Sequence, residues 1–375
     1  MRITSNFDSG NIEVLSIENP DDIQLNIRKD SNSDFYQWFY FRLTGAVNTA
    51  CTLKIMNAAG ASYPEGWEDY RAVVSYDRIN WFRVPTSYEN GQLVIKHMPE
   101  ENTVFYAYFA PFTYEQHLEL VQTASESYLC QYESLGLTYQ GREIDYLKIG
   151  ETDESKKNIW IIARQHPGES MAEWFIQGLI YRLLDESDPI SKMLLEKAVF
   201  HIVPHINVDG SILGNLRSNA AGMNLNREWG TPDKEKSPEV YYILKKMEET
   251  GVDLNLDIHG DEGLPYNFIS GIEGIPSFND KLSYLTEKFL ETWKRVNPDF
   301  QTKYGYPKNE PGKANLNVCS KAIGEKFKCL SLTMEMPFKE NADLPDQEFG
   351  WSSDRSEILG ASVLNVIYEI VDELR

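Results

Sequence analysis

Two short motifs place a histidine at or shortly after the end of an apolar run. The run at 160–163 leads into His166-Pro-Gly-Glu169, and Leu-Asn-Leu-Asp-Ile leads into His259-Gly. A histidine and a glutamate three residues apart can aim at one point across a Pro-Gly turn, which an extended strand does not allow. The first motif alone also fits a turn that begins a solvated helix. The second motif, in which another strand ends at a histidine, favours a metal site over that alternative. Two histidines and one glutamate leave a coordination position open, as in catalytic zinc sites, and predict that His166, Glu169 and His259 hold one Zn²⁺ per chain.

A single carboxylate stands in another apolar run, Leu-Ser-Leu-Thr-Met-Glu335-Met-Pro-Phe. An unpaired carboxylate buried in a strand costs several kcal/mol, so we expect it near the end of the strand, inside a site. Burial there raises its pKa toward the working range of a general base. We predict that Glu335 is the catalytic acid/base; the alternative is a structural glutamate held in a salt bridge.

Two arginines lie between these motifs, in Gly-Asn-Leu-Arg217 and in Asn-Leu-Asn226-Arg227-Glu-Trp. A hydrolase that acts at a chain end must recognise a terminal carboxylate, and an arginine beside an amide donor has the right shape for this. The alternative is a solvated loop with surface ion pairs.

His201 and His205 have a spacing that would suit two metal ligands on a helix. Their segment, Ala-Val-Phe-His-Ile-Val-Pro-His, has the composition of a strand, in which residues four apart are separated by roughly 13 Å. We therefore predict that they are packed histidines and do not share an ion.

Strands that alternate with helices must position these residues. Apolar runs predict strands at 159–163, 199–204, 254–258, 267–270 and 330–334. Helical periodicity predicts helices at 171–184, 238–249, 279–296 and 356–374. Side chains at neighbouring strand ends converge, and open α/β sheets place their sites there. We expect an α/β domain with this sheet over residues 113–375.

The amino-terminal region has a different pattern, with short alternating runs broken by turns. The segment Glu89-Asn90-Gly91 between two such runs predicts a tight hairpin, because Asn and Gly tolerate positive φ. We expect an antiparallel β-sandwich over residues 1–112.

Composition excludes several classes of protein. The chain of 375 residues has a formal charge of −21, which disfavours binding to nucleic acid or to anionic membranes. The amino terminus has no apolar run, so we expect a cytoplasmic protein. Four cysteines without C-x-x-C spacing predict free thiols.

Taken in order, these motifs resemble the zinc metallocarboxypeptidases, and in particular the bacterial members of the cytosolic carboxypeptidase branch. The tract His259-Gly-Asp-Glu-Gly-Leu-Pro-Tyr-Asn-Phe and the amino-terminal β-sandwich are similar to that branch. The resemblance implies that Asn226 and Arg227 bind the terminal carboxylate of a peptide or protein and that Arg217 polarises the scissile carbonyl. It also implies that Glu335 serves as acid/base.

Two features depart from the family pattern. Val208 stands where the family usually has proline. The tyrosine that digestive members place over the substrate has no assignable counterpart, although Tyr304 and Tyr306 lie nearby in sequence. The branch is associated with removal of C-terminal acidic residues, for which Lys313 is a candidate cation.

Two other functions fit parts of the pattern. An amidase or deacylase would use the same zinc ligands on acyl-amino acids or peptidoglycan stem peptides. A carboxypeptidase-like peptide-binding module would have lost turnover, but it would have no need of Glu335 in an apolar strand.

Overall fold

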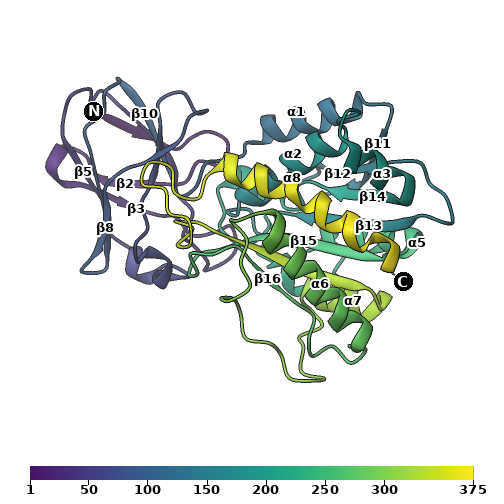
Figure 1. The fold of residues 1–375 in the computed structure, drawn as a ribbon. Coiled ribbons are helices and arrows are strands. Elements are labelled where there is room, and N and C mark those ends of the chain that lie inside the picture. Colours follow the sequence, from purple (N-terminus) through teal and green to yellow (C-terminus); the bar gives the residue numbers. More distant parts are fainter. Residues whose placement is uncertain (375) are drawn as a thin grey trace.

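The computed structural model describes residues 1–374, of which residues 2–107 form two five-stranded β-sheets (Figure 1). One sheet, in the order β1-β4-β10-β6-β7, is antiparallel throughout. The other, β2-β3-β5-β9-β8, contains one parallel pair, β3 with β5, so the predicted antiparallel sandwich holds except for this pair. The strands are β1 Arg2–Thr4, β2 Glu13–Ser16, β3 Ile23–Asn26, β4 Tyr40–Thr44, β5 Cys51–Ile55, β6 Val73–Ser75, β7 Phe82–Arg83, β8 Thr86–Glu89, β9 Gln92–His97 and β10 Thr103–Ala107.

The predicted hairpin joins β8 to β9. Asn90 and Gly91 both have positive φ, 51° and 79°, and Glu89 pairs with Gln92 across the turn. Two consecutive residues with positive φ give the turn the twist that adjacent strands need.

The second region contains a seven-stranded mixed sheet in the order β11-β12-β14-β13-β15-β17-β16. The central strands β14, β13, β15 and β17 are parallel to one another, and the outer pairings are antiparallel. The five predicted strands are present, whereas β11 and β12 were not predicted. The strands are β11 Cys130–Leu137, β12 Glu143–Ile149, β13 Lys157–Ala163, β14 Ala198–Val203, β15 Leu254–Asp261, β16 Phe268–Ser270 and β17 Leu330–Pro337.

Helices cover both faces of this sheet (Figure 1). The apolar residues of α2, α6 and α8 pack on one face, and those of α5 and α7 pack on the other. The helix predicted at the C-terminus begins slightly earlier than expected, because the side chain of Ser352 caps it by accepting from the Arg355 N–H. The helices are α1 Tyr114–Ser125, α2 Met171–Leu183, α3 Pro189–Lys197, α4 Val208–Leu213, α5 Pro238–Thr250, α6 Asp280–Val296, α7 Cys319–Phe327 and α8 Ser353–Ile370.

Two neighbouring strands carry polar residues on one face and apolar residues on the other. On β15 the alternate residues Asn255, Asp257 and His259 face away from the α2/α8 side, and their partners on β17 are Ser331, Thr333 and Glu335. The apolar residues between them join the core beneath α2 and α8. Parallel pairing in register therefore brings His259 next to Glu335.

The β-sandwich is anchored to the second region by a buried arginine. The Arg83 guanidinium donates to the carbonyl oxygens of Phe338, Lys339 and Trp351, at 2.8, 3.1 and 3.0 Å. Tyr108 of the sandwich stacks on Phe338 with ring centroids 4.4 Å apart. The sandwich thus contacts the segment that directly follows β17. No helix among residues 1–374 is both long and apolar enough to span a membrane.

Candidate active site

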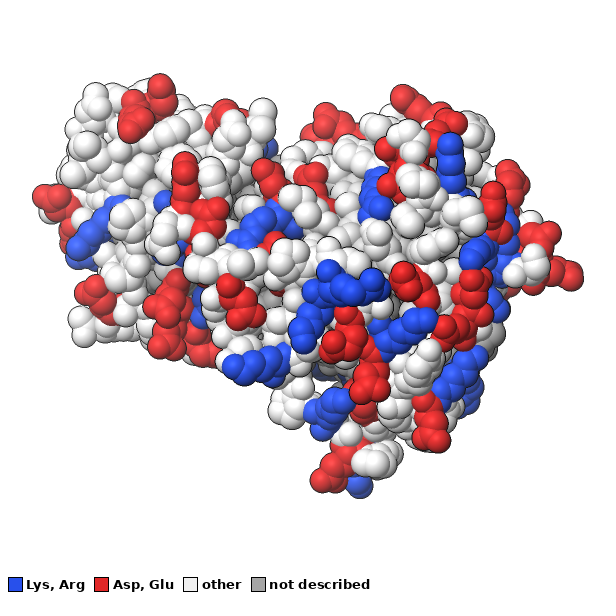
Figure 2. Space-filling view, viewed as in Figure 1, with Lys and Arg blue, Asp and Glu red and all other residues white. Residues whose placement is uncertain are grey.

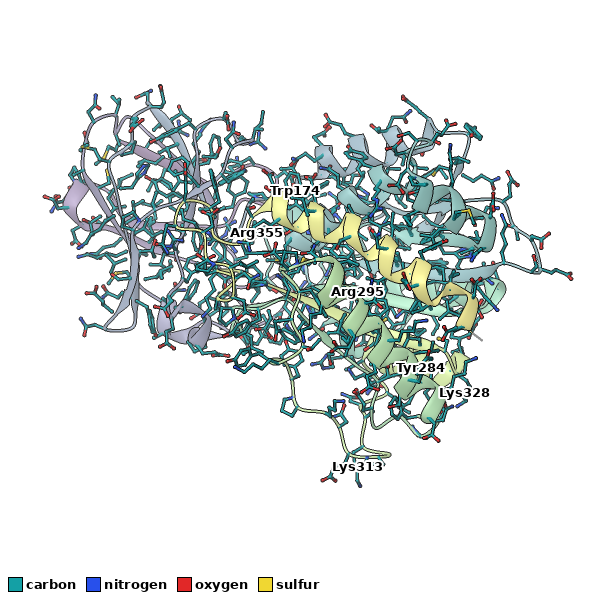
Figure 3. All side chains as sticks on the ribbon, viewed as in Figure 1. Trp174, Tyr284, Arg295, Lys313, Lys328 and Arg355 are labelled. Carbon is teal, nitrogen blue, oxygen red and sulfur yellow. The ribbon has the colours of Figure 1, made fainter. Side chains whose placement is uncertain are left out.

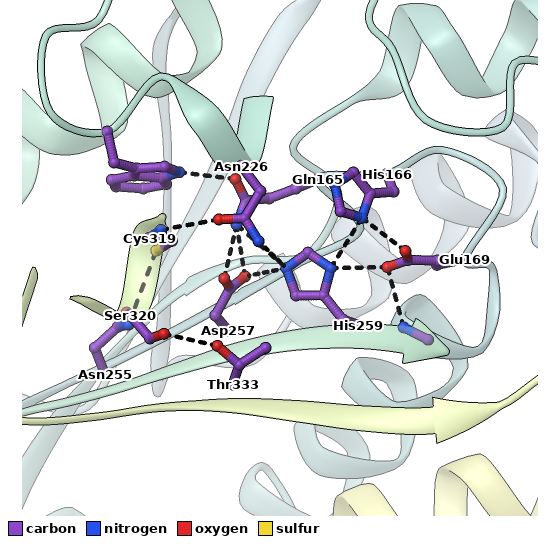
Figure 4. Close-up of polar contacts among 12 residues, drawn as sticks. Gln165, His166, Glu169, Asn226, Asn255, Asp257, His259, Cys319, Ser320 and Thr333 are labelled. Atoms are coloured by element: carbon purple, nitrogen blue, oxygen red, sulfur yellow. Dashed lines mark hydrogen bonds and ion pairs between the residues drawn. The ribbon is translucent and has the colours of Figure 1, made fainter. Parts of the chain in front are cut away.

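The predicted zinc ligands lie together at the ends of β13 and β15 (Figure 4). Glu169 Oε1 is 2.6 Å from His166 Nδ1, and Glu169 Oε2 is 2.8 Å from His259 Nδ1. The two Nδ1 atoms are 3.2 Å apart. We refer to these three residues as the cleft group.

Neighbouring side chains determine which imidazole nitrogens face inward. His259 Nε2 lies 3.0 Å from Asp257 Oδ1, and His166 Nε2 lies 3.1 Å from Asn224 Oδ1. A ring that donates its Nε2–H to such an acceptor keeps a lone pair on Nδ1. Two lone pairs and a carboxylate then converge on one point, a donor set that suits Zn²⁺. Asp257 and Asn224 were not predicted as partners, although Asp257 precedes His259 by two residues in the same strand.

The turn that carries His166 and Glu169 depends on a close backbone approach. The Gly168 N–H donates to the Leu216 carbonyl at 2.9 Å, and a Cβ at Gly168 would lie 3.0 Å from that oxygen. A larger residue would therefore have to displace the loop that bears Arg217, so glycine favours this close approach.

Glu335 is 7% exposed, and its Oε2 has no hydrogen-bond partner among the described residues. Burial raises the pKa of this carboxyl well above its usual range; His259 opposes that change, and the nearby Glu169 carboxylate adds to it. A carboxyl group with a raised pKa and a free oxygen can accept and return a proton near neutral pH. The alternative of a structural salt bridge does not describe this residue, since no cation pairs with it within residues 1–374.

Arg217, Asn226 and Arg227 line the same cleft, which has a volume of about 930 Å³. Asn226 is buried: its Oδ1 accepts from the Cys319 N–H at 2.8 Å, and its Nδ2 lies 3.3 Å from His259 Nε2. Arg227 is exposed on the cleft wall and donates to the Asn226 carbonyl at 2.6 Å. The three side chains predicted to bind substrate are thus gathered beside the cleft group.

Comparison with known proteins agrees with this arrangement. Residues 114–358 match the zinc carboxypeptidase family, and residues 3–109 match the cytosolic carboxypeptidase N-terminal domain. The chain belongs to the zinc carboxypeptidase family. Its predicted family, enzyme class and fold are confirmed, and the family implies a zinc cofactor.

Solved structures and a eukaryotic relative support the assignment. A metallo-carboxypeptidase from Burkholderia cenocepacia superimposes with a TM-score of 0.97 and 48% identity over 100% of both chains. A metallo-carboxypeptidase from Pseudomonas aeruginosa gives a TM-score of 0.98 and 44% identity, again over 100% of each chain. Cytosolic carboxypeptidase 6 of Caenorhabditis elegans is 26% identical over 369 residues, covering 89% of this chain and 78% of that relative.

Two tyrosines with no assigned role in the sequence lie in different places in this carboxypeptidase. Tyr306 lines the cleft, and its hydroxyl donates to Asp261. Tyr304 stacks on Tyr266 with centroids 4.3 Å apart and does not line the cleft. Tyr63 of the β-sandwich also lines the cleft, so the amino-terminal region forms part of its wall.

The cleft of the carboxypeptidase contains a buried lysine that sequence reasoning did not find. Lys321, in the first turn of α7, is 8% exposed, and its Nζ donates to Ser270 Oγ at 3.1 Å. It forms no ion pair with any residue in the range 1–374. Lys313, the predicted cation, also lines the cleft, but it is exposed on a loop that projects from the body of the molecule (Figure 3). Nothing in the local sequence distinguishes Lys321 as a cleft residue.

His201 and His205 of the carboxypeptidase do not meet each other. His201 stacks on Trp160, with centroids 4.9 Å apart, and pairs with Asn158 at 2.9 Å. His205 lies beyond the end of β14, in a second set of possible ligands with His117 and Glu173. We refer to His117, Glu173 and His205 as the buried group. Cys51, Cys130, Cys319 and Cys329 are free and buried.

Proposed function

We propose that the protein hydrolyses the last peptide bond of peptides or proteins and prefers a C-terminal acidic residue. One observation carries the proposal: a single cleft gathers the cleft group, the unpaired carboxylate of Glu335 and five cationic side chains, which are those of Arg217, Arg227, Lys313, Lys321 and Lys339. The proposal also assigns residues 1–112 to a β-sandwich domain and residues 113–375 to the catalytic domain. The names of the cytosolic carboxypeptidase relatives support a cytoplasmic location.

The residues of the chain divide the work of catalysis. His166, Glu169 and His259 hold the zinc ion, which supplies Lewis-acid polarisation and activation of water at neutral pH. Glu335 removes a proton from the attacking water and returns one to the leaving amine. Arg217 stabilises the negative charge that develops on the carbonyl oxygen.

Recognition of the chain end rests on Asn226 and Arg227. An arginine can bind a carboxylate through two parallel N–H groups, which favours a free C-terminus over an internal peptide bond. Partial desolvation of the guanidinium at the cleft wall lowers the pKa of Arg227, with Arg217 as a second cause, so neutralisation of this charge by a substrate carboxylate is favourable.

The preference for an acidic side chain rests on Lys321. Burial lowers the pKa of its ammonium group, and the Glu335 carboxylate is the largest opposing influence. A buried ammonium without an ion-pair partner gains most from a substrate carboxylate. Acidic residues are spread over both regions of the molecule (Figure 2), so attraction for such a substrate has to be local to the cleft.

The P. aeruginosa relative was crystallised with (2-guanidinoethylmercapto)succinic acid, which carries two carboxylates and a guanidino group. The carboxylates suit a cleft lined with cations. The guanidino group carries the opposite charge to a glutamate side chain, so the preference proposed for this chain depends on Lys321 and not on that complex.

The test is hydrolysis of matched peptides that end in Glu, Asp, Leu, Lys or Arg, with products weighed by mass spectrometry. We expect the highest kcat/KM for an acidic terminal residue and no cleavage when the C-terminus is amidated. Lys321→Met should lower kcat/KM for the Glu-ending peptide about 10- to 100-fold, as a lost charge-assisted hydrogen bond predicts, and affect the Leu-ending peptide little.

Lys313→Met is the matched comparison, because it removes an exposed lysine that lines the same cleft. Loss of Glu preference in Lys313→Met and not in Lys321→Met would contradict the role of Lys321. Hydrolysis of acyl-amino acids without hydrolysis of any peptide would identify an amidase instead, and binding without turnover would identify a peptide-binding module.

A further inference from the structure

A turn of the β-sandwich holds the loop that carries Arg217. The carboxylate of Asp30 accepts three successive backbone N–H groups, from Leu216 at 2.6 Å, Arg217 at 2.8 Å and Ser218 at 2.9 Å. It also accepts the Ser218 hydroxyl at 2.9 Å. Asp30 is 4% exposed, so these four contacts replace its hydration.

Other contacts continue along the same loop. The Ser31 N–H donates to Asn215 Oδ1 at 3.0 Å, and Asn32 Nδ2 donates to the Ala220 carbonyl at 3.0 Å. Gly222 has φ +87°, and a Cβ there would lie 2.3 Å from the Asn32 carbonyl oxygen. The turn at 30–32 therefore contacts the loop over most of its length.

The side chain of Arg217 is also flanked by residues of the β-sandwich. Its guanidinium carbon lies 5.3 Å from the ring centroid of Tyr63 and 5.8 Å from that of Phe35. It forms no ion pair within residues 1–374, and it lines the cleft. Backbone contacts and two aromatic rings from the amino-terminal region thus contribute to its position.

We propose that Asp30 is a positioning residue for Arg217, so that the amino-terminal β-sandwich completes the active site of the catalytic region. The inference rests on the proposed role of Arg217 in stabilising the transition state. An ionised carboxylate can accept all four donors at once, because it offers only acceptor oxygens. Three consecutive N–H groups bound to one carboxylate fix the backbone of 216–218 and hence the origin of the arginine side chain.

Asparagine at position 30 keeps the shape but presents an NH₂ group to N–H donors that need an acceptor. Asp30→Asn should therefore release part of the loop without removing Arg217. Loss of one transition-state donor lowers kcat about 10²- to 10³-fold, and displacement should cost less, roughly 10- to 100-fold, with KM little changed.

The experiment compares Asp30→Asn, Arg217→Ala and the double variant of the full chain, with kcat, KM and bound zinc measured for each. Zinc is measured because the Leu216 carbonyl also accepts the Gly168 N–H of the turn that carries His166 and Glu169. Asp34→Asn is the control: Asp34 lies in the same turn, its side chain is 95% exposed and it pairs with Lys29. We expect lower kcat in both single variants, no further loss in the double variant, unchanged zinc content and a control that behaves as wild type.

The outcomes are separable. Wild-type kcat in Asp30→Asn, or single effects that multiply in the double variant, would overturn the positioning role. Wild-type kcat in Arg217→Ala would overturn the proposed role of Arg217 in catalysis. It would also overturn the proposal that the contact between Asp30 and residues 216–218 serves catalysis. If Asp30→Asn does not fold, Ser218→Ala removes one of the four donors and should lower kcat about 3- to 10-fold, again without effect in the Arg217→Ala background; no change would overturn the proposal.

Discussion

Residues 1–374 contain two sets of two histidines and one glutamate close enough to hold a metal ion, and the two sets are not equivalent. The cleft group has both Glu169 oxygens and two imidazole nitrogens directed at one point, and all three residues line the cleft. In the buried group, His117 lies between two carboxylates, 2.7 Å from Glu173 Oε1 and 2.8 Å from Asp145 Oδ2. Glu173 Oε2 binds Arg164 at 2.6 Å, and none of these residues lines the cleft.

Charge explains the difference. Although burial lowers the pKa of His117, Glu173 and Asp145 outweigh it and raise the pKa to about 9. With His117 protonated, two cations, His117 and Arg164, balance the carboxylates of Asp145 and Glu173, so a metal ion would add uncompensated charge. The side chain of Arg164 also donates to the Pro167 carbonyl at 3.0 Å, so Arg164 connects the buried group to the turn of the cleft group. Residue type is thus insufficient to identify a metal site. The protonation of the candidate ligands and the charges beside them determine whether a metal ion can bind.

The largest expected effect is on metal content. His259→Ala should lose its zinc and all measurable turnover, because two protein ligands are too few. His205→Ala should retain one zinc per chain by elemental analysis. Two zinc ions per wild-type chain, one of them lost in His205→Ala, would show that the buried group also binds zinc. That result would contradict the distinction between the two groups.

Glu335→Gln tests the chemistry of the cleft group without removing a ligand. Glutamine keeps the shape but cannot accept a proton, so kcat should fall about 10²- to 10⁴-fold, while zinc content and peptide binding persist. Single-turnover kinetics and calorimetric titration with a C-terminal peptide measure the two properties separately. A variant as active as wild type would remove Glu335 from the mechanism.

Glu173→Gln tests the buried group through stability. It leaves the charges of Arg164 and His117 without one carboxylate, and breaking a buried ion pair costs about 3–5 kcal/mol. Urea unfolding measures the loss. Glu249→Gln, at an exposed position 3.8 Å from Lys246, is the control and should change the free energy of unfolding by no more than about 0.5 kcal/mol. Equal effects would argue against a charge-balanced group.

The smallest effect concerns pH. Because the folded-state pKa of His117 is about 9, above its ordinary 6.5, protonation stabilises the folded state. This contribution is complete below pH 6.5 and is lost as the pH rises through 9, by on the order of 3 kcal/mol. The free energy of unfolding of wild type, relative to His117→Gln, should therefore decline over this range. A constant difference would mean that His117 is neutral when folded.

Local sequence determined several elements and the positions of the cleft group. The continuous apolar run of β13, the period-two alternation of β15 and β17 and the apolar residues of α8, from Leu359 to Ile370, are properties of neighbouring residues, so the sequence alone can predict these elements. His166 and His259 are similarly marked, since each follows an apolar run and precedes a glycine or Pro-Gly turn. In-register parallel pairing then brings Glu335 beside His259.

Tertiary structure alone decided which charged residues act together. His117, Asp145 and Glu173 come from α1, β12 and α2, and no periodicity connects them. The loop of Lys313 and the helix of Lys321 are adjacent in sequence, yet only the packing of α7 against the sheet buries the second lysine. Asp30 lies 187 residues from Arg217. Burial and charge partners depend on long-range packing, whereas the patterns legible in a sequence extend over a few neighbouring residues.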